Sequence, residues 1–563
     1  MTDSAVGLSL TNRVLPAEPL FDRDAYERAG GGLGLVAARR LGAVGVVEHL
    51  LAAGLRGRGG AGFPTGRKWA EVAARTSASV PTTVVVNAAE GEPGSFKDRA
   101  ILRRNPFAVL EGALIAAEAL AADRVVVAVK SSFQREIAIL RRAIETLSAL
   151  PPSRGVVIEL FEGPSAYLYG EETALLEAID GRPPFPRVSP PYRYGVDEIT
   201  PESDDAPPAL VDNVETMANV PGIMHWGPAW FRELGTPQSP GTIVCTVSGD
   251  VDHAGVGEVP MGTPLREIID AIGGGARHGH RLVAAMSGVA NPVVPERLLD
   301  TPASYEGMEA IGSGLGAAGF IVFDDTTDPI ALAHAVSRFL AVESCGQCTP
   351  CKGDGRALMG IFDRLQRGES HHTDLADIDD RLSTVADSAR CFLATQHQRV
   401  VGSIVSLFRD DVRSRVQHPR ASSEPEFVAA LVAIEDGKAT LDEHERDKQP
   451  DWSFDAVDSG KTPVDRLGRG HPAAARATRE PRPRRQPAPP PPPPEHHDLP
   501  PGEVRIEDVQ PDPESRLYSS EPLDTDEGTV VIQQQNVGAE EELGGGEWPD
   551  PHTPPREPAP GAD

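Results

Sequence analysis

Four of the five cysteines in this 563-residue chain have a spacing that suits a metal centre. Cys345, Cys348 and Cys351 form the run SCGQCTPC, and Cys391 follows forty residues later. Three ligands from one tight loop and a fourth from a distant segment are typical of a [4Fe–4S] cluster. Structural zinc usually takes two ligands from each of two knuckles, so zinc is the weaker alternative. The fifth, Cys245, lies in the apolar run TIVCTVS, which predicts a buried side chain without chemistry.

A glycine-rich segment reads GLRGRGGAGFPTGRKW. Gly57, Gly59 and Gly62 match the G-x-G-x-x-G pattern, but a helix is predicted before them and no acidic residue follows at the required distance. The dinucleotide-binding fingerprint is therefore rejected. The unobstructed backbone N–H groups, with Arg58 and Lys68 close in sequence, still suit a phosphate group or a flat ring. A flexible surface hairpin is the alternative.

A second loop, NAAEGEPGSFKDR, spans Asn87 to Arg99 and follows a predicted strand. Ligands of open α/β sheets bind at the carboxyl ends of strands, so this loop is a candidate site. Glu90 and Glu92 could hydrogen-bond ribose hydroxyls or a carboxamide. A solvated acidic turn is the alternative.

A third loop, YLYGEET, spans Tyr167 to Thr173 and begins a predicted helix. The free N–H groups at a helix N-terminus can hold an anion. Glu171 and Glu172 could equally complement the helix dipole without binding anything.

The elements that must position these loops alternate between strands and helices up to residue 224. Apolar strands are expected at 82–87, 124–130 and 156–161, with helices at 44–53, 107–122, 133–150 and 171–179. Such alternation predicts an α/β domain with a mainly parallel, covered sheet. A small α+β module follows, with strands at 242–248, 282–286 and 319–323 and a helix at 264–272. Helices at 328–342, 355–365, 378–388 and 392–412 surround the cysteines.

The three loops, DNVETMANVP and ESCGQCTPC occur in a fixed order. This set resembles the flavin-bearing, NADH-oxidising subunit of respiratory complex I, the NuoF type, and related subunits of NAD-linked hydrogenases and formate dehydrogenases. The resemblance covers about Leu20 to Asp411. It implies an α/β FMN- and NADH-binding domain at 1–235, a β-grasp (SLBB-like) module at 240–325 and a helical [4Fe–4S]-binding domain at 328–440. Residues 445–563 are expected to be a disordered, proline-rich, charged tail.

The resemblance also implies an activity, that of an NADH dehydrogenase subunit. NADH would give a hydride to FMN, and single electrons would pass to the [4Fe–4S] cluster and then to a protein partner, expected to be a [2Fe–2S] or ferredoxin-type subunit. The chemistry would be that of the cofactors, which the protein orients and tunes.

Carried over residue by residue, the resemblance implies a set of binding positions. The cluster ligands would be Cys345, Cys348, Cys351 and Cys391, and the candidate catalytic residue would be Glu90. The expected cofactor contacts are Gly57, Arg58, Gly59, Gly60, Phe63 (stacking on adenine), Lys68, Asn87, Glu90, Glu92, Tyr167, Gly170, Glu171, Glu172, Asp212 and Asn213.

Three departures from the family pattern keep two alternatives open. Ala89 stands where an acidic flavin contact is usual, Asp212 replaces an asparagine, and Glu71 stands where some relatives have an aromatic residue. A carboxylate at position 212 would lower the potential of a reduced flavin by repulsion. The chain could therefore be an electron relay with weak or no NADH use, or a scaffold subunit with vestigial catalysis.

Composition excludes some partners. With 54 basic and 83 acidic residues the net charge is −29, which disfavours nucleic acid and anionic membrane surfaces. No secretory signal or spanning helix is predicted, so a cytoplasmic location is expected, with membrane contact only through a larger complex. Of the 53 prolines, 23 lie at 450–563, in a stretch too poor in aromatic residues to form a core. It predicts a solvated tail, or an arm that docks a partner.

Overall fold

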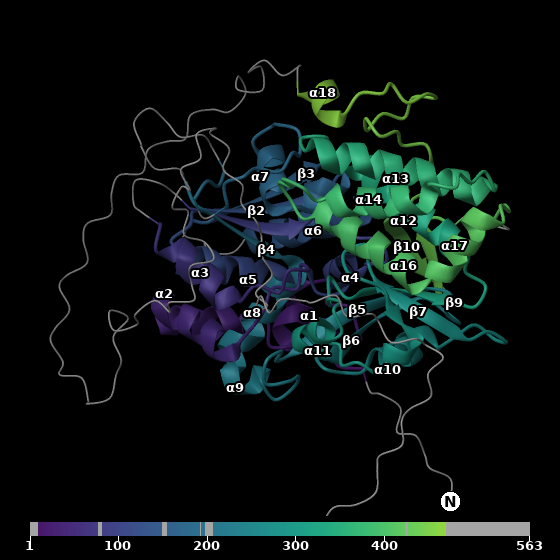
Figure 1. The fold of residues 1–563 in the computed structure, drawn as a ribbon. Coiled ribbons are helices and arrows are strands. Elements are labelled where there is room, and N and C mark those ends of the chain that lie inside the picture. The colour runs from purple at the N-terminus through teal and green to yellow at the C-terminus, as the bar shows by residue number, and fades with distance from the viewer. Residues whose placement is uncertain are drawn as a thin grey trace, which may run out of the picture. The chain divides into compact units, whose positions relative to one another are not determined.

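The computed structural model describes residues 10–76, 82–148, 155–191, 193–196, 207–422 and 426–468 (Figure 1). These residues belong to the first of two units into which the chain divides, Met1–Arg482. The remainder of the predicted tail, from residue 469 onward, lies outside the described residues.

A parallel sheet forms the first region. Its strands are ordered β3-β2-β1-β4, and every neighbouring pair is parallel. The bounds are β1 Thr83–Ala88, β2 Arg124–Lys130, β3 Val157–Gly163 and β4 Ala209–Asn213. Val84 and Val86 enter one hydrophobic core and Val85 enters another, as the two-residue period of a strand requires. The predicted covered, parallel sheet is therefore confirmed.

Helices cover this sheet on both sides. Three helices share the core of Val84: α2 (Leu33–Ala53), α5 (Pro106–Ala119) and α8 (Val214–Trp226). Helix α7 (Glu172–Ile179) shares the core of Val85 on the other side. The other helices of this region are α1 Arg23–Arg28, α3 Thr65–Ala73, α4 Lys97–Arg104, α6 Gln134–Ser148, the 3₁₀ helix η1 Tyr167–Gly170 and α9 Pro228–Phe231.

Helix α2 is longer than predicted. The expected helix at 44–53 is present, but helical structure already begins at Leu33. Gly42 interrupts it with φ 70° and ψ 176°, values outside the helical region. Because glycine has no Cβ, it accepts this positive φ without strain, and the chain kinks there.

A mixed sheet forms the second region, with strand order β6-β5-β9-β7-β8. Strands β5 and β9 are parallel, while the other neighbours are antiparallel. The elements are β5 Thr242–Gly249, β6 Gly255–Pro260, α10 Leu265–Gly273, β7 Leu282–Ser287, β8 Val294–Pro295, η2 Glu296–Leu298, α11 Tyr305–Ala310 and β9 Gly319–Asp324. Cys245 is fully buried in β5, as predicted.

The third region is helical and carries the cysteines. Its helices are α12 Pro329–Glu343, α13 Thr349–Arg367, α14 Asp374–Thr384, α15 Leu393–Gln396, the π-helical turn η3 His397–Val401, α16 Gly402–Leu407 and α17 Arg409–Gln417. The single helix predicted at 392–412 is thus broken by a π-helical turn, a feature that is frequent at functional sites. Helix α13 starts six residues earlier than expected, so that Cys348 is its N-cap and Cys351 lies in its first turn.

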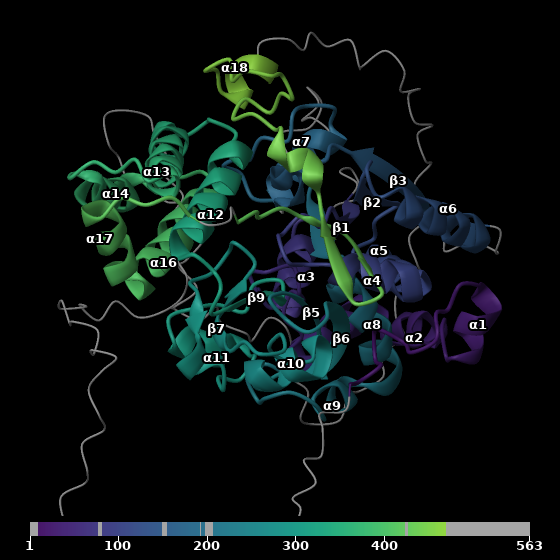
Figure 2. The same ribbon diagram turned by 90° about the vertical axis from the view of Figure 1, so that its right-hand side faces the viewer.

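A β-hairpin follows the helices: β10 (Leu431–Glu435) and β11 (Lys438–Leu441). It lies against both sheet regions (Figure 2). The Leu431 carbonyl accepts a hydrogen bond from the guanidinium of Arg99 in α4, and the Ala254 N–H donates to the Gly437 carbonyl at 2.7 Å.

Residues 442–468, here called the C-terminal strap, differ from the prediction of a tail that is disordered from residue 445. They include η4 (Glu443–Arg446) and α18 (Pro463–Leu467). Lys448 is 5% exposed and Trp452 is 9% exposed, and the indole Nε1–H donates to the Val342 carbonyl at 2.9 Å. A few anchoring side chains bury this segment against the helical region, which average composition could not reveal.

Candidate functional site

The four cysteines converge as their spacing predicted. Cys345 follows α12, Cys348 and Cys351 begin α13, and Cys391 lies in the turn before α15. All four line one small cavity. They are free thiols rather than disulfides. The Arg390 N–H points at the Cys348 sulfur, at 3.4 Å, a contact of the kind that tunes cluster potential.

The chemistry of this donor set fits an iron–sulfur cluster. Burial raises the pKa of Cys345 and of Cys351 to about 11, and raises the pKa of Cys391 well above its ordinary value. Bound iron compensates that cost, because a metal stabilises the thiolate form of its ligands.

The glycine loop links α2 to α3 and is held as a narrow turn. The Gly57 N–H donates to the Phe63 carbonyl at 2.8 Å. Gly60 and Gly62 have φ values of 129° and 65°, which favour glycine. No atom lies within 4 Å of a Cβ built on Gly60, while one built on Gly59 would lie 3.2 Å from the Asn213 Cβ. The loop therefore presents open backbone beside the carboxyl end of β4, which fits a flavin phosphate or ring.

Arg58 is placed differently from the expectation that it adds charge to the cofactor site. Its guanidinium is 1% exposed and donates to the carbonyls of Arg56, Pro240 and Thr242 at 3.0–3.2 Å. Arg58 thus fixes the glycine loop against the second region instead of facing a ligand.

Lys68 joins the first loop to the third. Its ammonium donates to the Val211 carbonyl at 2.6 Å, pairs with Glu172 and lies 3.7 Å from Asp212. Asp212 also accepts a hydrogen bond from the Trp69 indole at 2.7 Å. Burial raises the pKa of Asp212 to about 6. The Asp212 carboxylate, which departs from the family pattern, therefore contacts donors of the protein itself, Trp69 and Lys68.

Glu90 was the candidate catalytic residue, and its surroundings argue against that role. Its carboxylate accepts from Ser95 Oγ at 2.7 Å, from the Asp98 N–H at 3.1 Å and from Arg99 Nε at 2.9 Å. The side chain is buried. A carboxylate committed to three donors holds the loop in shape and has little capacity left for a substrate. Ala89 is also buried, in the core beneath α7.

Glu92 and Tyr167 form the polar contact between the second and third loops. The Tyr167 hydroxyl donates to Glu92 Oε2 at 2.6 Å, and the Val289 N–H donates to Glu92 Oε1 at 2.6 Å. Gln396, which sequence reasoning missed, donates to the Tyr167 hydroxyl at 2.9 Å. Burial raises the pKa of Glu92 to about 7. This network joins all three regions of the fold.

Three other predicted residues serve the scaffold. Asn87 Nδ2 donates to the Gly170 carbonyl at 2.8 Å, which ties the second loop to the third. Glu171 is the N-cap of α7, and Asn213 is the N-cap of α8. The contacts of Glu171 therefore agree with the alternative in which it complements the N-terminus of a helix without binding a ligand.

Phe63 belongs to the glycine loop, and its stacking on adenine stays a prediction. Its ring is partly exposed, with the Arg67 guanidinium 5.8 Å from the ring centre.

Comparison with known proteins places this geometry in a family. Residues 50–222 match the Nuo51 FMN-binding domain, residues 244–291 the SLBB domain, and residues 331–415 the iron–sulfur binding region of NADH-ubiquinone oxidoreductase-F. The chain is 34% identical over 384 residues to the NADH-quinone oxidoreductase F subunit 2 of Rhizobium meliloti (strain 1021), a match that covers 67% of this chain and 89% of the relative. The chain belongs to the NuoF family, the F subunits of NADH-quinone oxidoreductase.

Another F subunit and one solved structure agree. The NADH-quinone oxidoreductase F subunit of Mycobacterium bovis (strain ATCC BAA-935 / AF2122/97) is 36% identical over 388 residues, covering 66% of this chain and 84% of that protein. The H₂-reduced NAD⁺-reducing [NiFe]-hydrogenase matches with a TM-score of 0.60 and 34% identity, covering 68% of this chain. This chain spans 64% of that hydrogenase chain, slightly less than two thirds. In this NuoF-family protein the hairpin and strap lie beyond residue 415, where the iron–sulfur match ends.

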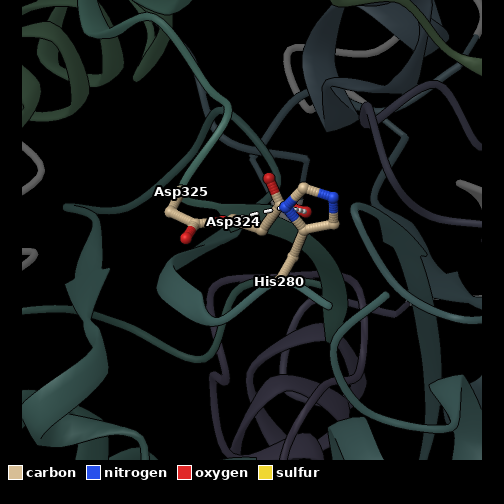
Figure 3. Close-up of side chains that lie close together, drawn as sticks. All are labelled: His280, Asp324 and Asp325. Carbon is tan, nitrogen blue, oxygen red and sulfur yellow. Dashed lines mark hydrogen bonds and ion pairs between the residues drawn. The ribbon is translucent and has the colours of Figure 1, made fainter. Parts of the chain in front are cut away.

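A separate cluster of His280, Asp324 and Asp325 lies in the mixed-sheet region (Figure 3). His280 Nδ1 is 3.1 Å from Asp325 and 4.0 Å from Asp324. Arg277 already pairs with Asp324 at 2.7 Å, so the group is explained as an ion-pair cluster.

None of the described helices is long and apolar enough to cross a membrane.

Proposed function

We propose that this protein is the NADH-oxidising subunit of a larger electron-transfer complex, with FMN and a [4Fe–4S] cluster as its cofactors. Bound FMN would supply the hydride-accepting chemistry for NADH, and the cluster would supply the one-electron chemistry that follows. The observation that carries this proposal is the meeting of two loops. Tyr167 contacts the second flavin-type loop through Glu92, and the next residue, Leu168, lines the cysteine cavity.

The chain's own residues would hold and orient the cofactors. The open backbone of the glycine loop would receive FMN, with Lys68 and Asn213 at its edge. Glu92 and Tyr167, which join two candidate loops through one hydrogen bond, would border the substrate. Cys345, Cys348, Cys351 and Cys391 would ligate the cluster. Glu90, Glu171 and Arg58 would maintain the shape of the site.

The electron acceptor would be another protein, of the [2Fe–2S] or ferredoxin type. The chain's described residues carry one cavity lined by four cysteines, so electrons need a further carrier beyond it. The relatives are named as subunits, which supports an assembly of several chains. The cytoplasmic location remains a prediction from the sequence.

The relay and scaffold alternatives rest on Ala89, Asp212 and Glu71, and the surroundings of Asp212 weaken the case for both. Asp212 is 5% exposed and is held by Trp69 and Lys68, so its charge is partly compensated. Glu71 is partly exposed on α3, where burial raises its pKa and Arg67 and Arg75 oppose that shift.

One spectroscopic experiment separates the three functions. Full-length protein reconstituted anaerobically with FMN, iron and sulfide is expected to show flavin and broad iron–sulfur absorption. NADH is then expected to bleach both. Flavin that dithionite reduces and NADH does not would favour the relay. Protein that takes up neither cofactor would favour the scaffold.

A further inference from the structure

A second, larger cavity, with a volume of about 220 Å³, lies beneath the β10–β11 hairpin. Leu431 and Val432 of the hairpin and Asp442 and Glu445 of the strap line one part of it. These residues follow the family-matched iron–sulfur region, which ends at residue 415. The cavity is therefore completed by a segment outside the matched domains. Among the described residues, neither the four cysteines nor the glycine loop line it.

Lys130, the last residue of β2, lines this cavity and is 4% exposed. Within the described chain its ammonium has no hydrogen bond and no ion-pair partner within 4 Å. Burying an unpaired charge is costly, and burial accordingly lowers the pKa of Lys130 to about 8. Gly91 makes room for it, since a Cβ at that position would collide with Lys130 Nζ.

The neighbouring basic groups differ from Lys130 because they are paired. Arg99 Nε bonds Glu90 at 2.9 Å, and Arg103 pairs with Glu136. Arg135 is exposed and lies 4.0 Å from the Glu435 carboxylate.

The acidic groups of the cavity are also committed. Glu343 pairs with Lys448, and Glu445 lies 3.4 Å from the same ammonium. Asp442 accepts the His444 N–H at 3.1 Å as the cap of η4. Among the described residues that line the cavity, Lys130 is thus the buried charged group without a direct partner, and a bound anion would supply one.

We propose that this cavity binds a small oxyanion, a carboxylate or a phosphate, with Lys130 as its charged anchor. Ser132 and Ser165 line the same cavity and carry hydroxyl groups that can donate to the anion. Gly91 and Tyr167 also line it, so the ligand lies against the loops that carry Glu90 and Glu92. Tyr167 also belongs to the proposed substrate site, so a bound anion would adjoin that site, which offers a route by which a metabolite regulates it.

The test is calorimetric titration of full-length, FMN- and cluster-loaded protein with inorganic phosphate and, separately, with citrate. We expect saturable binding of at least one anion with one site per chain. Lys130→Met is expected to weaken it at least about tenfold, because the charge-assisted contact is lost. Lys130→Arg keeps the charge and is expected to retain binding. Lys438→Met, an exposed change in β11, is the matched control.

Phosphate and citrate distinguish the two ligand sources. Saturation by phosphate alone would indicate a phosphate ligand, and saturation by citrate alone a carboxylate. Absence of saturable binding to the unaltered protein would overturn the proposal. So would equal affinity in Lys130→Met and the unaltered protein. If Lys130→Met loses FMN or unfolds, the comparison of Lys130→Arg with Lys130→Gln decides: equal affinity in these two variants overturns the proposal, and weaker binding by Lys130→Gln supports it.

Discussion

Lys448 of the C-terminal strap forms a buried ion pair with Glu343, the last residue of α12. The two side chains are 6% and 1% exposed. The other carboxylate oxygen of Glu343 accepts the Tyr167 N–H at 3.1 Å. One acidic residue thus connects the strap, the helix that leads to Cys345 and the third flavin-type loop. This relationship makes the strap part of the electron-transfer core rather than an appendage.

The ion pair gives the first prediction. Lys448→Met leaves the Glu343 carboxylate buried without its partner, so we expect a loss of about 3–5 kcal/mol in the free energy of unfolding. Chemical denaturation measures it. Lys461→Met, at an exposed strap position, is the control and is expected to change stability by less than about 0.5 kcal/mol. Equal stability of the two variants would show that the pair is open to solvent.

The cluster ligands give the second prediction. Cys391→Ser removes one of four ligands, so we expect iron content and broad visible absorption to fall sharply while FMN binding persists. Cys245→Ala is the matched control, because Cys245 is buried in β5 and does not line the cysteine cavity. Iron content equal to that of the unaltered protein in Cys391→Ser would refute the ligand assignment.

The hydrogen bond from Trp452 of the strap to the Val342 carbonyl gives the third prediction. Trp452→Phe keeps an aromatic ring beside Phe185 but removes the donor to the Val342 carbonyl, three residues before Cys345. We expect the reconstituted cluster to lose its absorption several-fold faster in air, because the loop is held less firmly. Phe454→Leu changes an exposed aromatic residue of the same strap and serves as control. Identical rates of absorption loss in both variants would show that the strap does not protect the cluster.

Glu92 gives the fourth prediction, on pH dependence. Burial raises its pKa from 4.5 to about 7, so between these values the folded protein keeps a proton that the unfolded chain releases. The stability contributed by this group is complete below about pH 4.5 and is lost as the pH rises to about 7. Glu92→Gln cannot ionise, and we expect a flatter decline in unfolding free energy from pH 5 to 8. The exposed change Glu48→Gln should leave the slope as it was.

Local patterns were sufficient to predict much of the fold. The valine-rich runs at 82–87 and 124–130 became β1 and β2 almost residue for residue, because strands buried on both faces read as continuous apolar segments. The long helix expected at 392–412 was wrong, since nothing in its apolar spacing indicates the π-helical turn at His397–Val401. The disorder expected from residue 445 was wrong up to residue 468, because Lys448 and Trp452 are stabilised by partners about 100 positions away in sequence.

The sequence by itself determined which chemistry is possible: four cysteines in a three-plus-one spacing, a glycine loop with open backbone and the order of the three regions. Residue type and spacing are local properties, so they can be read without coordinates. The tertiary structure decided how each side chain is used. It turned Arg58 away from the cofactor loops, committed Glu90 to the scaffold, and joined Tyr167 to Glu92, Gln396 and Glu343. These roles depend on which groups meet after folding, because a charge buried beside a partner and one buried alone have different energies. Among the described residues, Lys130 meets no direct partner at the cavity beneath the hairpin, which also only the tertiary structure shows.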